Sequence, residues 1–286
     1  MISGRVTEGL ARSPMAHWTL DDIPWERFDA SQVDPEILKI VKAASLVEHN
    51  GYAYARYLEQ VFGDDPEFQT VAWRWAREEV QHGDALARWA TLADPSFDFA
   101  AAFALFAAKI KLPVGTERSV RGTRAGELVA RCVVEVGTSS YYTALASAAE
   151  EPVLHEICRH IAADEVRHYK LFYTHLTDYL ARERIGPLRR VLVALGRLTE
   201  SEDDELAFAY YAANHAGDGP YERKRYSSAY ARRAYRFFRP VHVERAVAMT
   251  MKAVGLNPRG RLSRALARLA GWFMEARAAR LARAGA

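Results

Sequence analysis

The feature that most limits how this chain can fold is a motif that occurs twice, Glu-x-x-His. It stands at Glu79 and His82 and again at Glu165 and His168. Residues three apart on a helix share a face, so each motif brings a carboxylate oxygen and an imidazole nitrogen within reach of one point. Because one such motif arises easily by chance, its meaning depends on the sequence around it.

The rest of the chain is typical of helix almost throughout. From Pro35 onward Ala, Leu, Glu and Arg are abundant, apolar residues recur at intervals of three and four, and alternating strand patterns are missing. The breaks fall at Gly and Pro, which places helices at residues 34–62, 66–92, 97–110, 123–149, 152–182, 186–199, 202–216, 221–237, 240–254 and 259–283. We therefore predict an all-α fold, a long antiparallel bundle joined by short turns.

A glutamate precedes each motif at a matching interval. Glu48 and Glu79 are placed about equally far from the Gly63-Asp64 break, and Glu135 and Glu165 about equally far from the break near Pro152. In an antiparallel hairpin, residues equidistant from the turn lie at the same height, roughly 22 Å from the turn at 1.5 Å per residue. Each hairpin therefore places one glutamate beside one Glu-x-x-His motif.

Two such hairpins that face each other would surround one point with four carboxylates and two imidazoles. Four like charges in a dry core cost many kcal/mol unless cations neutralise them, which predicts two bound metal ions. Mixed oxygen and nitrogen ligands suit iron or manganese. The predicted ligands are Glu48, Glu79, His82, Glu135, Glu165 and His168. The alternative is a set of surface carboxylates on amphipathic helices.

Four neighbouring residues have positions that suit supporting roles. A metal-bound histidine usually donates its other N–H to a carboxylate, so Asp164 is expected to serve His82, and Glu78 to serve His168. The alternative for both is an exposed acid. Thr138 is expected to place its hydroxyl by the metals or to serve as a small packing residue. Trp75 is expected to wall the pocket or simply to pack in the core.

These residues resemble the ferritin-like di-iron carboxylate superfamily, and within it most closely the soluble acyl-carrier-protein desaturases. The family motifs Glu-Glu-x-x-His-Gly and Asp-Glu-x-x-His stand here at residues 78–83 and 164–168. Trp75 and Thr138 match a tryptophan and a threonine of the same family. The resemblance covers about residues 34–182 and implies a ferritin-like antiparallel four-helix bundle. Residues 1–33 are then an irregular segment, and residues 183–286 are additional C-terminal helices packed on the bundle.

The resemblance implies an O2-dependent oxidoreductase that acts on an unactivated C–H bond of a long apolar acyl substrate. Glu48, Glu79 and His82 would hold one iron, and the second Glu-and-His set the other, with some glutamates bridging and manganese possible at one position. Thr138 would help to manage protons. An electron donor, an acidic acyl carrier protein and a homodimer are the implied partners.

Other relatives fit less well. Ribonucleotide reductase small subunits need a radical tyrosine where this chain has Leu86, and arylamine N-oxygenases add a histidine where it has Ile161. Cys132 and Cys158 are too few for the iron module of rubrerythrins. Two alternatives stay open: a di-iron oxygenase that hydroxylates or N-oxidises another small molecule, and a ferroxidase or iron-handling protein.

The net charge of +3 hides an uneven distribution of charge. Residues 219–286 hold 16 Lys and Arg against 3 acids. Either these arginines face water and the acidic body, or they form a dock for an acidic carrier protein or an anionic membrane surface. Nucleic acid is not the expected partner because no binding motif appears. Without an apolar signal core, a CxxC motif or a stretch long enough to span a bilayer, a cytoplasmic protein is expected.

Overall fold

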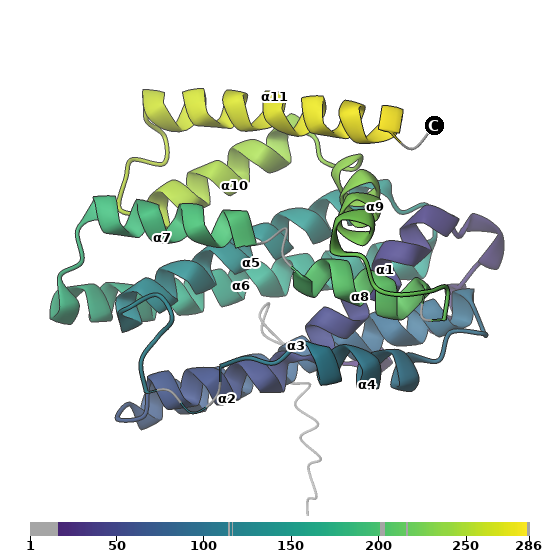
Figure 1. Ribbon diagram of the computed structural model, residues 1–286, viewed down its shortest axis with the longest axis horizontal. Coiled ribbons are helices and arrows are strands. Elements are labelled where there is room, and N and C mark those ends of the chain that lie inside the picture. Colours follow the sequence, from purple (N-terminus) through teal and green to yellow (C-terminus); the bar gives the residue numbers. More distant parts are fainter. Residues whose placement is uncertain (1–16, 114, 116, 201–203, 216, 285–286) are drawn as a thin grey trace, which may run out of the picture.

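A computed structural model describes residues 17–113, 115, 117–200, 204–215 and 217–284 (Figure 1). Residues 1–16 of the predicted irregular segment lie outside this range. Over the described residues the chain is all-α, as predicted, and contains no strand. Three short 3₁₀ helices, at Leu20–Asp22, Trp25–Arg27 and Ala30–Gln32, precede the first long helix.

The α-helices follow the predicted ranges closely. They are α1 (Pro35–His49), α2 (Gly51–Val61), α3 (Pro66–Ala93), α4 (Phe99–Lys109), α5 (Arg124–Ala148), α6 (Pro152–Glu183), α7 (Pro187–Glu200), α8 (Asp204–Asn214), α9 (Arg223–Tyr235), α10 (Pro240–Ala253) and α11 (Arg261–Ala284).

The predicted single helix over residues 34–62 is wrong, because the chain breaks at Asn50 into α1 and α2. Asn50 has φ −79° and ψ 6°, outside the helical region, and it caps both helices. The next residue packs directly on α3: a Cβ at Gly51 would lie 2.7 Å from the Glu79 Cβ and 2.8 Å from the Ala76 carbonyl oxygen. The break lets the chain lie close against α3. A straight helix with a larger side chain at position 51 could not approach α3 so closely.

The helices begin where side chains satisfy their free N–H groups. Asp65 accepts a hydrogen bond from the Phe68 amide at 2.9 Å, and Thr123 accepts one from the Gly126 amide at 2.9 Å. Glu151 does the same for Leu154 at 2.8 Å, at the N-terminus of α6. Proline occupies the first position of α1, α3 and α6, where its missing N–H costs nothing. The caps at Asp65 and Glu151 fix the two hairpin turns. The positions of the site residues along the helices are predicted from their distance to these turns.

Two hairpins form the centre of the molecule. In one, α1 and α2 pack along α3, and in the other α5 packs along α6; α3 also contacts α6 and joins the two. Buried apolar side chains form two clusters, one around Leu46, Trp89 and Leu154 and the other around Phe62 and Phe172. Along α3 and along α6 the predicted metal ligands fall between these clusters. The apolar core is therefore divided by one polar layer.

The C-terminal helices cover one side of these hairpins (Figure 1). Helices α7 and α10 pack on α5, α8 packs on α1, and α9 packs on α8. Arg233 of α9 pairs with Glu36 at 2.8 Å, and Arg236, which directly follows α9, pairs with Asp34 at 2.6 Å, both at the start of α1. Part of the basic region is thus matched to acids of the body.

Helix α11 lies outermost and contacts α9 and α10. Its apolar stripe is largely exposed to solvent, as is a similar stripe on α7. The exposed residues are Leu188, Leu192, Leu195 and Leu198 on α7, and Leu262, Leu266, Leu269, Trp272 and Phe273 on α11. Within the described part of the chain, no helix combines the length and hydropathy needed to cross a membrane.

Candidate metal centre

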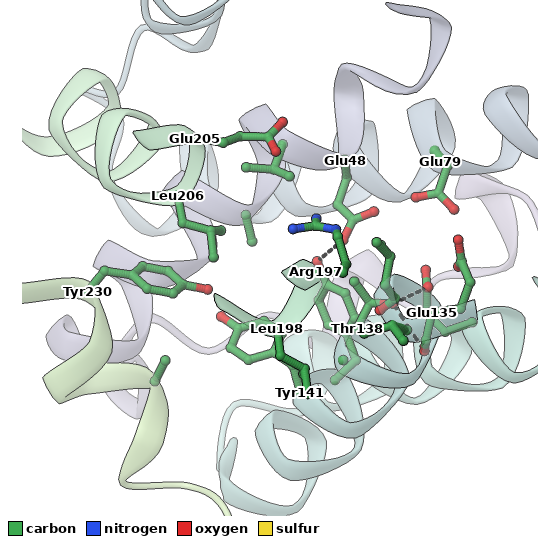
Figure 2. A pocket seen from close by; sticks show the side chains of 18 of the residues that line it. Glu48, Glu79, Glu135, Thr138, Tyr141, Arg197, Leu198, Glu205, Leu206 and Tyr230 are labelled. Atoms are coloured by element: carbon green, nitrogen blue, oxygen red, sulfur yellow. Dashed lines mark hydrogen bonds between the residues drawn. The ribbon is translucent and has the colours of Figure 1, made fainter. Parts of the chain in front are cut away.

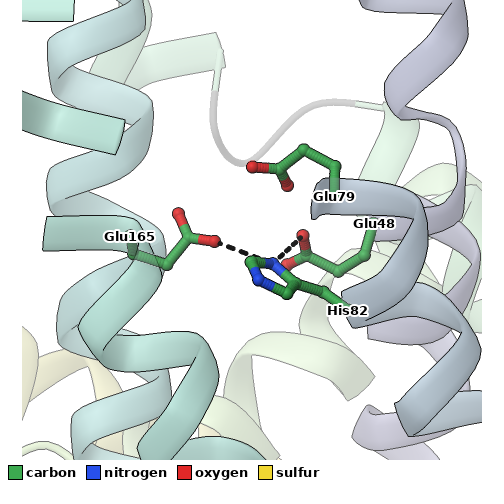
Figure 3. Close-up of side chains that lie close together, drawn as sticks. All are labelled: Glu48, Glu79, His82 and Glu165. Atoms are coloured by element: carbon green, nitrogen blue, oxygen red, sulfur yellow. Dashed lines mark ion pairs between the residues drawn. The ribbon is translucent and has the colours of Figure 1, made fainter. Parts of the chain in front are cut away.

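The six predicted ligands meet in the polar layer and form two overlapping groups. Within each group the ligand atoms lie within 4.8 Å of one another, and every residue is buried. The two groups share Glu79 and Glu165. Figure 3 shows the first group, in which dashed lines join the Glu48 and Glu165 carboxylates to the same edge of the His82 ring. The groups are Glu48, Glu79, His82 and Glu165, and Glu79, Glu135, Glu165 and His168.

Both imidazole rings present Nδ1 to the centre. His82 Nδ1 lies 3.3 Å from Glu165 Oε1 and 3.9 Å from Glu48 Oε2. His168 Nδ1 lies 2.9 Å from Glu79 Oε1 and 3.7 Å from Glu135 Oε2. Each ring therefore directs one nitrogen towards a set of carboxylate oxygens, as a metal-binding histidine does.

The other nitrogen of each ring faces an acid on the far side. His82 Nε2 lies 3.0 Å from Asp164 Oδ2, and His168 Nε2 lies 2.9 Å from Glu78 Oε2. These are the pairs expected from the sequence. A carboxylate that accepts a hydrogen bond from Nε2–H keeps the proton on Nε2. Nδ1 of the neutral ring then carries a lone pair, and this is the form that binds a metal.

Sequence reasoning missed the group that ties the two outer acids together. Arg167 donates to Asp164 Oδ1 at 2.7 Å and to Glu78 Oε2 at 2.6 Å. Its position three residues after Asp164 on α6 was an available signal. The indole N–H of Trp18 also donates to Asp164, at 2.8 Å. No local spacing could have predicted that contact, because Trp18 comes from the segment before α1.

Tyr142 was also missed, and Thr138 and Trp75 lie at the centre. Tyr142 donates its hydroxyl to Glu48 Oε1 at 2.6 Å, from two helical turns beyond Glu135 on α5. Thr138 donates its hydroxyl to Glu165 Oε2. Trp75 is buried and presents an edge-to-face contact to the His168 ring, with ring centroids 6.4 Å apart.

The side-chain atoms at the centre fit a bound cation. Among the described residues, five atoms that face the centre are buried without a hydrogen-bond partner, namely Glu79 Oε1, His82 Nδ1, Glu135 Oε1, Glu165 Oε1 and His168 Nδ1. A buried polar atom without a partner costs roughly 1–3 kcal/mol, and more if it is charged. Carboxylate oxygens and imidazole nitrogens together are a donor set for transition metals such as iron and manganese.

Crowding raises the pKa of two of the glutamates and of the imidazoles alike. Burial, and then the charge of Glu165, raises the pKa of Glu135 to about 8, and the same two causes raise that of Glu79. Burial opposes the charged form of His82, but the Asp164 and Glu165 carboxylates raise its pKa well above the usual value. The carboxylates therefore attract positive charge, and the imidazoles supply it as long as no metal does.

A cavity of about 320 Å³ opens onto the same carboxylates (Figure 2). Glu48, Glu79 and Glu135 lie at one side of it, and Leu206 and Tyr230 at the other. Thr138 and Trp75 also line it. The volume is within the range of small-molecule sites, and the centre is thus accessible to a substrate without being exposed to bulk water.

Gly83 controls how closely α1 approaches α3 beside the ligands. A Cβ at this position would lie 2.5 Å from the His49 backbone nitrogen, next to Glu48. We expect Gly83→Ala to push the helices apart and to lower the free energy of unfolding by about 1–3 kcal/mol, with weaker metal binding. Urea denaturation and metal content measure the two effects.

Gly271→Ala on α11 is the matched control, because nothing lies within 4 Å of its added Cβ. Alanine is there expected to be neutral or to stabilise by up to about 1 kcal/mol. Equal stabilities for Gly83→Ala and wild type would mean that the close approach of α1 to α3 is not needed.

Comparison of the sequence with models of known protein families and with curated proteins returns no match. The chemistry of the centre is therefore inferred from its own side chains.

Proposed function

We propose that this protein is a di-iron oxidoreductase of the ferritin-like superfamily that oxidises a C–H bond of an apolar substrate. The observation that carries the proposal is the pair of buried ligand groups that share Glu79 and Glu165 and border a cavity. Two divalent ions would balance four carboxylates, and two shared glutamates would hold them close together. Iron is preferred, and manganese at one position is compatible with the same donors.

The ligands divide into shared and separate ones. Glu79 and Glu165 belong to both groups, whereas Glu48 with His82 and Glu135 with His168 each belong to one. Asp164 and Glu78 hold the imidazole rings in place through Nε2. When bound, the iron pair would supply redox chemistry with O2.

Thr138 is the residue best placed to handle a proton at this centre. It lines the cavity and donates its hydroxyl to the shared Glu165. A hydroxyl can both donate and accept, so Thr138 can pass a proton between this carboxylate and the cavity. Tyr142 donates its hydroxyl to Glu48 and can thereby hold the carboxylate of that ligand in place.

The cavity favours oxidation of a substrate over handling of iron. A ferroxidase needs a route for iron ions, whereas the lining of this cavity beyond the ligands includes many aromatic and aliphatic side chains, such as Trp75, Tyr230 and Leu206. Removal of two hydrogens, as in the acyl-carrier-protein desaturases, is the first candidate reaction. Hydroxylation or N-oxidation is the second. The basic C-terminal region is the proposed face for an acidic carrier protein, an electron donor or an anionic membrane, and the cytoplasm is the proposed compartment.

Anaerobic iron loading followed by reductant and O2 tests the proposal. We expect about two iron ions per chain, reductant-dependent O2 uptake, and a product that has lost two hydrogens or gained one oxygen. Thr138→Val is expected to keep its iron and to slow turnover about a hundredfold, and Thr138→Ser to restore it.

Iron uptake far above two ions per chain, in a large hollow assembly, would instead identify a ferroxidase. Failure to retain iron at all would contradict the metal centre itself.

A further inference from the structure

Two arginines in the cavity have no role in holding the metal ligands. Arg131 of α5 and Arg197 of α7 both line the cavity that reaches the four glutamates. Arg131 lies one helical turn before Glu135, so its Cα is about 6 Å along the helix axis from that of a ligand. The structure places the Arg197 side chain on the side of Glu48 and Glu205 (Figure 2).

Arg131 is a buried cation that forms no ion pair within 4 Å among the described residues. Its side chain belongs to a residue only 7% exposed, and its Nε has no hydrogen-bond partner among the described residues. Its guanidinium carbon lies 5.0 Å from the Tyr54 ring centre and 5.9 Å from that of Trp75. These aromatic rings hold the guanidinium in place, but they do not supply the negative charge that a buried cation requires.

Arg197 adds a second positive charge close to the first. Burial, and then the charge of Arg131, lowers the pKa of Arg197, which indicates that the two guanidinium groups repel each other. The remaining acid of this region, Glu205, accepts the Tyr54 hydroxyl at 2.6 Å, and the charges of both arginines act against the burial that raises its pKa. Two like charges held together in a partly dry cavity are stable only if an anion offsets them.

The charges that line the cavity leave one positive charge unmatched. Two divalent ions would neutralise Glu48, Glu79, Glu135 and Glu165, and Glu205 can offset one of the two arginines. The formal remainder is one positive charge, which suits a monoanion such as a carboxylate. Guanidinium groups bind carboxylates through two parallel hydrogen bonds.

We propose that Arg131 and Arg197 bind the carboxylate group of the substrate, so that the substrate is a free carboxylic acid with an apolar body. This inference rests on the proposed function, because it names the substrate class of the same cavity. The inference replaces a protein-bound thioester as the candidate substrate, since a thioester carries no charge for two buried arginines to bind. The basic C-terminal region would then serve an electron donor or an anionic membrane and not a carrier protein.

Calorimetric titration of the metal-loaded protein under nitrogen tests the proposal, with decanoate, 1-decanol and decyl phosphate as probes. We expect decanoate to bind at least tenfold more tightly than decanol, because only decanoate offers the arginines an anion. Arg131→Gln and Arg197→Gln are each expected to weaken decanoate roughly tenfold to hundredfold and to leave decanol unchanged. Arg159→Gln, an exposed arginine of α6 paired with Glu156, is the control without effect.

The outcomes separate this inference from the proposed function. The titration is repeated on metal-free protein, where a carboxylate cannot coordinate a metal. Decanoate is expected to bind more weakly there, because the glutamates are no longer neutralised, but its binding is still expected to depend on the two arginines. Equal affinity for decanoate and decanol, or unchanged affinity in both arginine variants, would overturn the assignment even if the iron content is about two per chain. Tenfold preference for decyl phosphate would replace the carboxylate by a phosphate ester. If Arg131→Gln fails to fold, the affinities of Arg197→Gln and the comparison of the three probes on wild type still decide the outcome.

Discussion

Replacing Glu165 with alanine is expected to abolish binding of both metal ions, whereas Glu48→Ala is expected to retain about one ion per chain. Glu165 belongs to both ligand groups, and its Oε1 lies 3.3 Å from His82 Nδ1 and 3.9 Å from His168 Nδ1. Glu48 belongs to one group only, so the other keeps its four ligands. Elemental analysis after anaerobic iron loading measures the difference.

Glu156→Ala is the matched control for these variants. Glu156 is on the same helix as Glu165 but pairs with Arg159 at 2.6 Å, away from the centre. It is expected to bind as much metal as wild type. Equal metal contents for Glu48→Ala and Glu165→Ala would mean that the two groups do not share ligands in the way their geometry indicates.

Removal of the metals is expected to lower the melting temperature by about 8 °C or more. A ligand at a thousand times its Kd contributes about 4 kcal/mol to the free energy of unfolding, and in a chain of this size each kcal/mol shifts Tm by about 2 °C or more. The metal-free centre also has to keep protons on buried groups that the metals would otherwise neutralise, as the raised pKa values of Glu79 and Glu135 indicate. Calorimetry before and after chelation, and again after reloading, measures the effect.

The Glu165→Ala variant shows whether this effect comes from the proposed centre. A chelator is expected to leave its melting temperature unchanged, since it holds no metal to lose. A similar drop in both proteins would place the stabilising metal elsewhere in the molecule.

The helices and the gathering of Glu and His residues could be predicted from the sequence because both depend on local spacing. Helical periodicity and the Gly and Pro breaks locate the hairpins, and distance from each turn then sets the height of Glu48 and Glu135. The pairings of Asp164 and Glu78 with the two rings followed from the same register.

The remaining parts of the site depend on contacts between distant segments. Trp18 reaches Asp164 from outside the hairpins, and Arg197 reaches the cavity from α7, whose packing no spacing reveals. The break at Asn50 was missed because Gly51 can also occur within a helix, and only its contact with α3 explains the change of direction. Sequence periodicity describes one helix at a time, whereas these features depend on the relative placement of two.

The polar layer that divides the core also has a consequence for how the protein opens. Apolar side chains on the two sides of this layer form separate clusters. Each end of the hairpins is therefore stabilised by its own hydrophobic cluster. Where two such regions meet across charged groups, metal ions are the links that make them unfold as one unit. Amide hydrogen exchange should therefore show one cooperative unit with metals bound and two units with different protection after their removal.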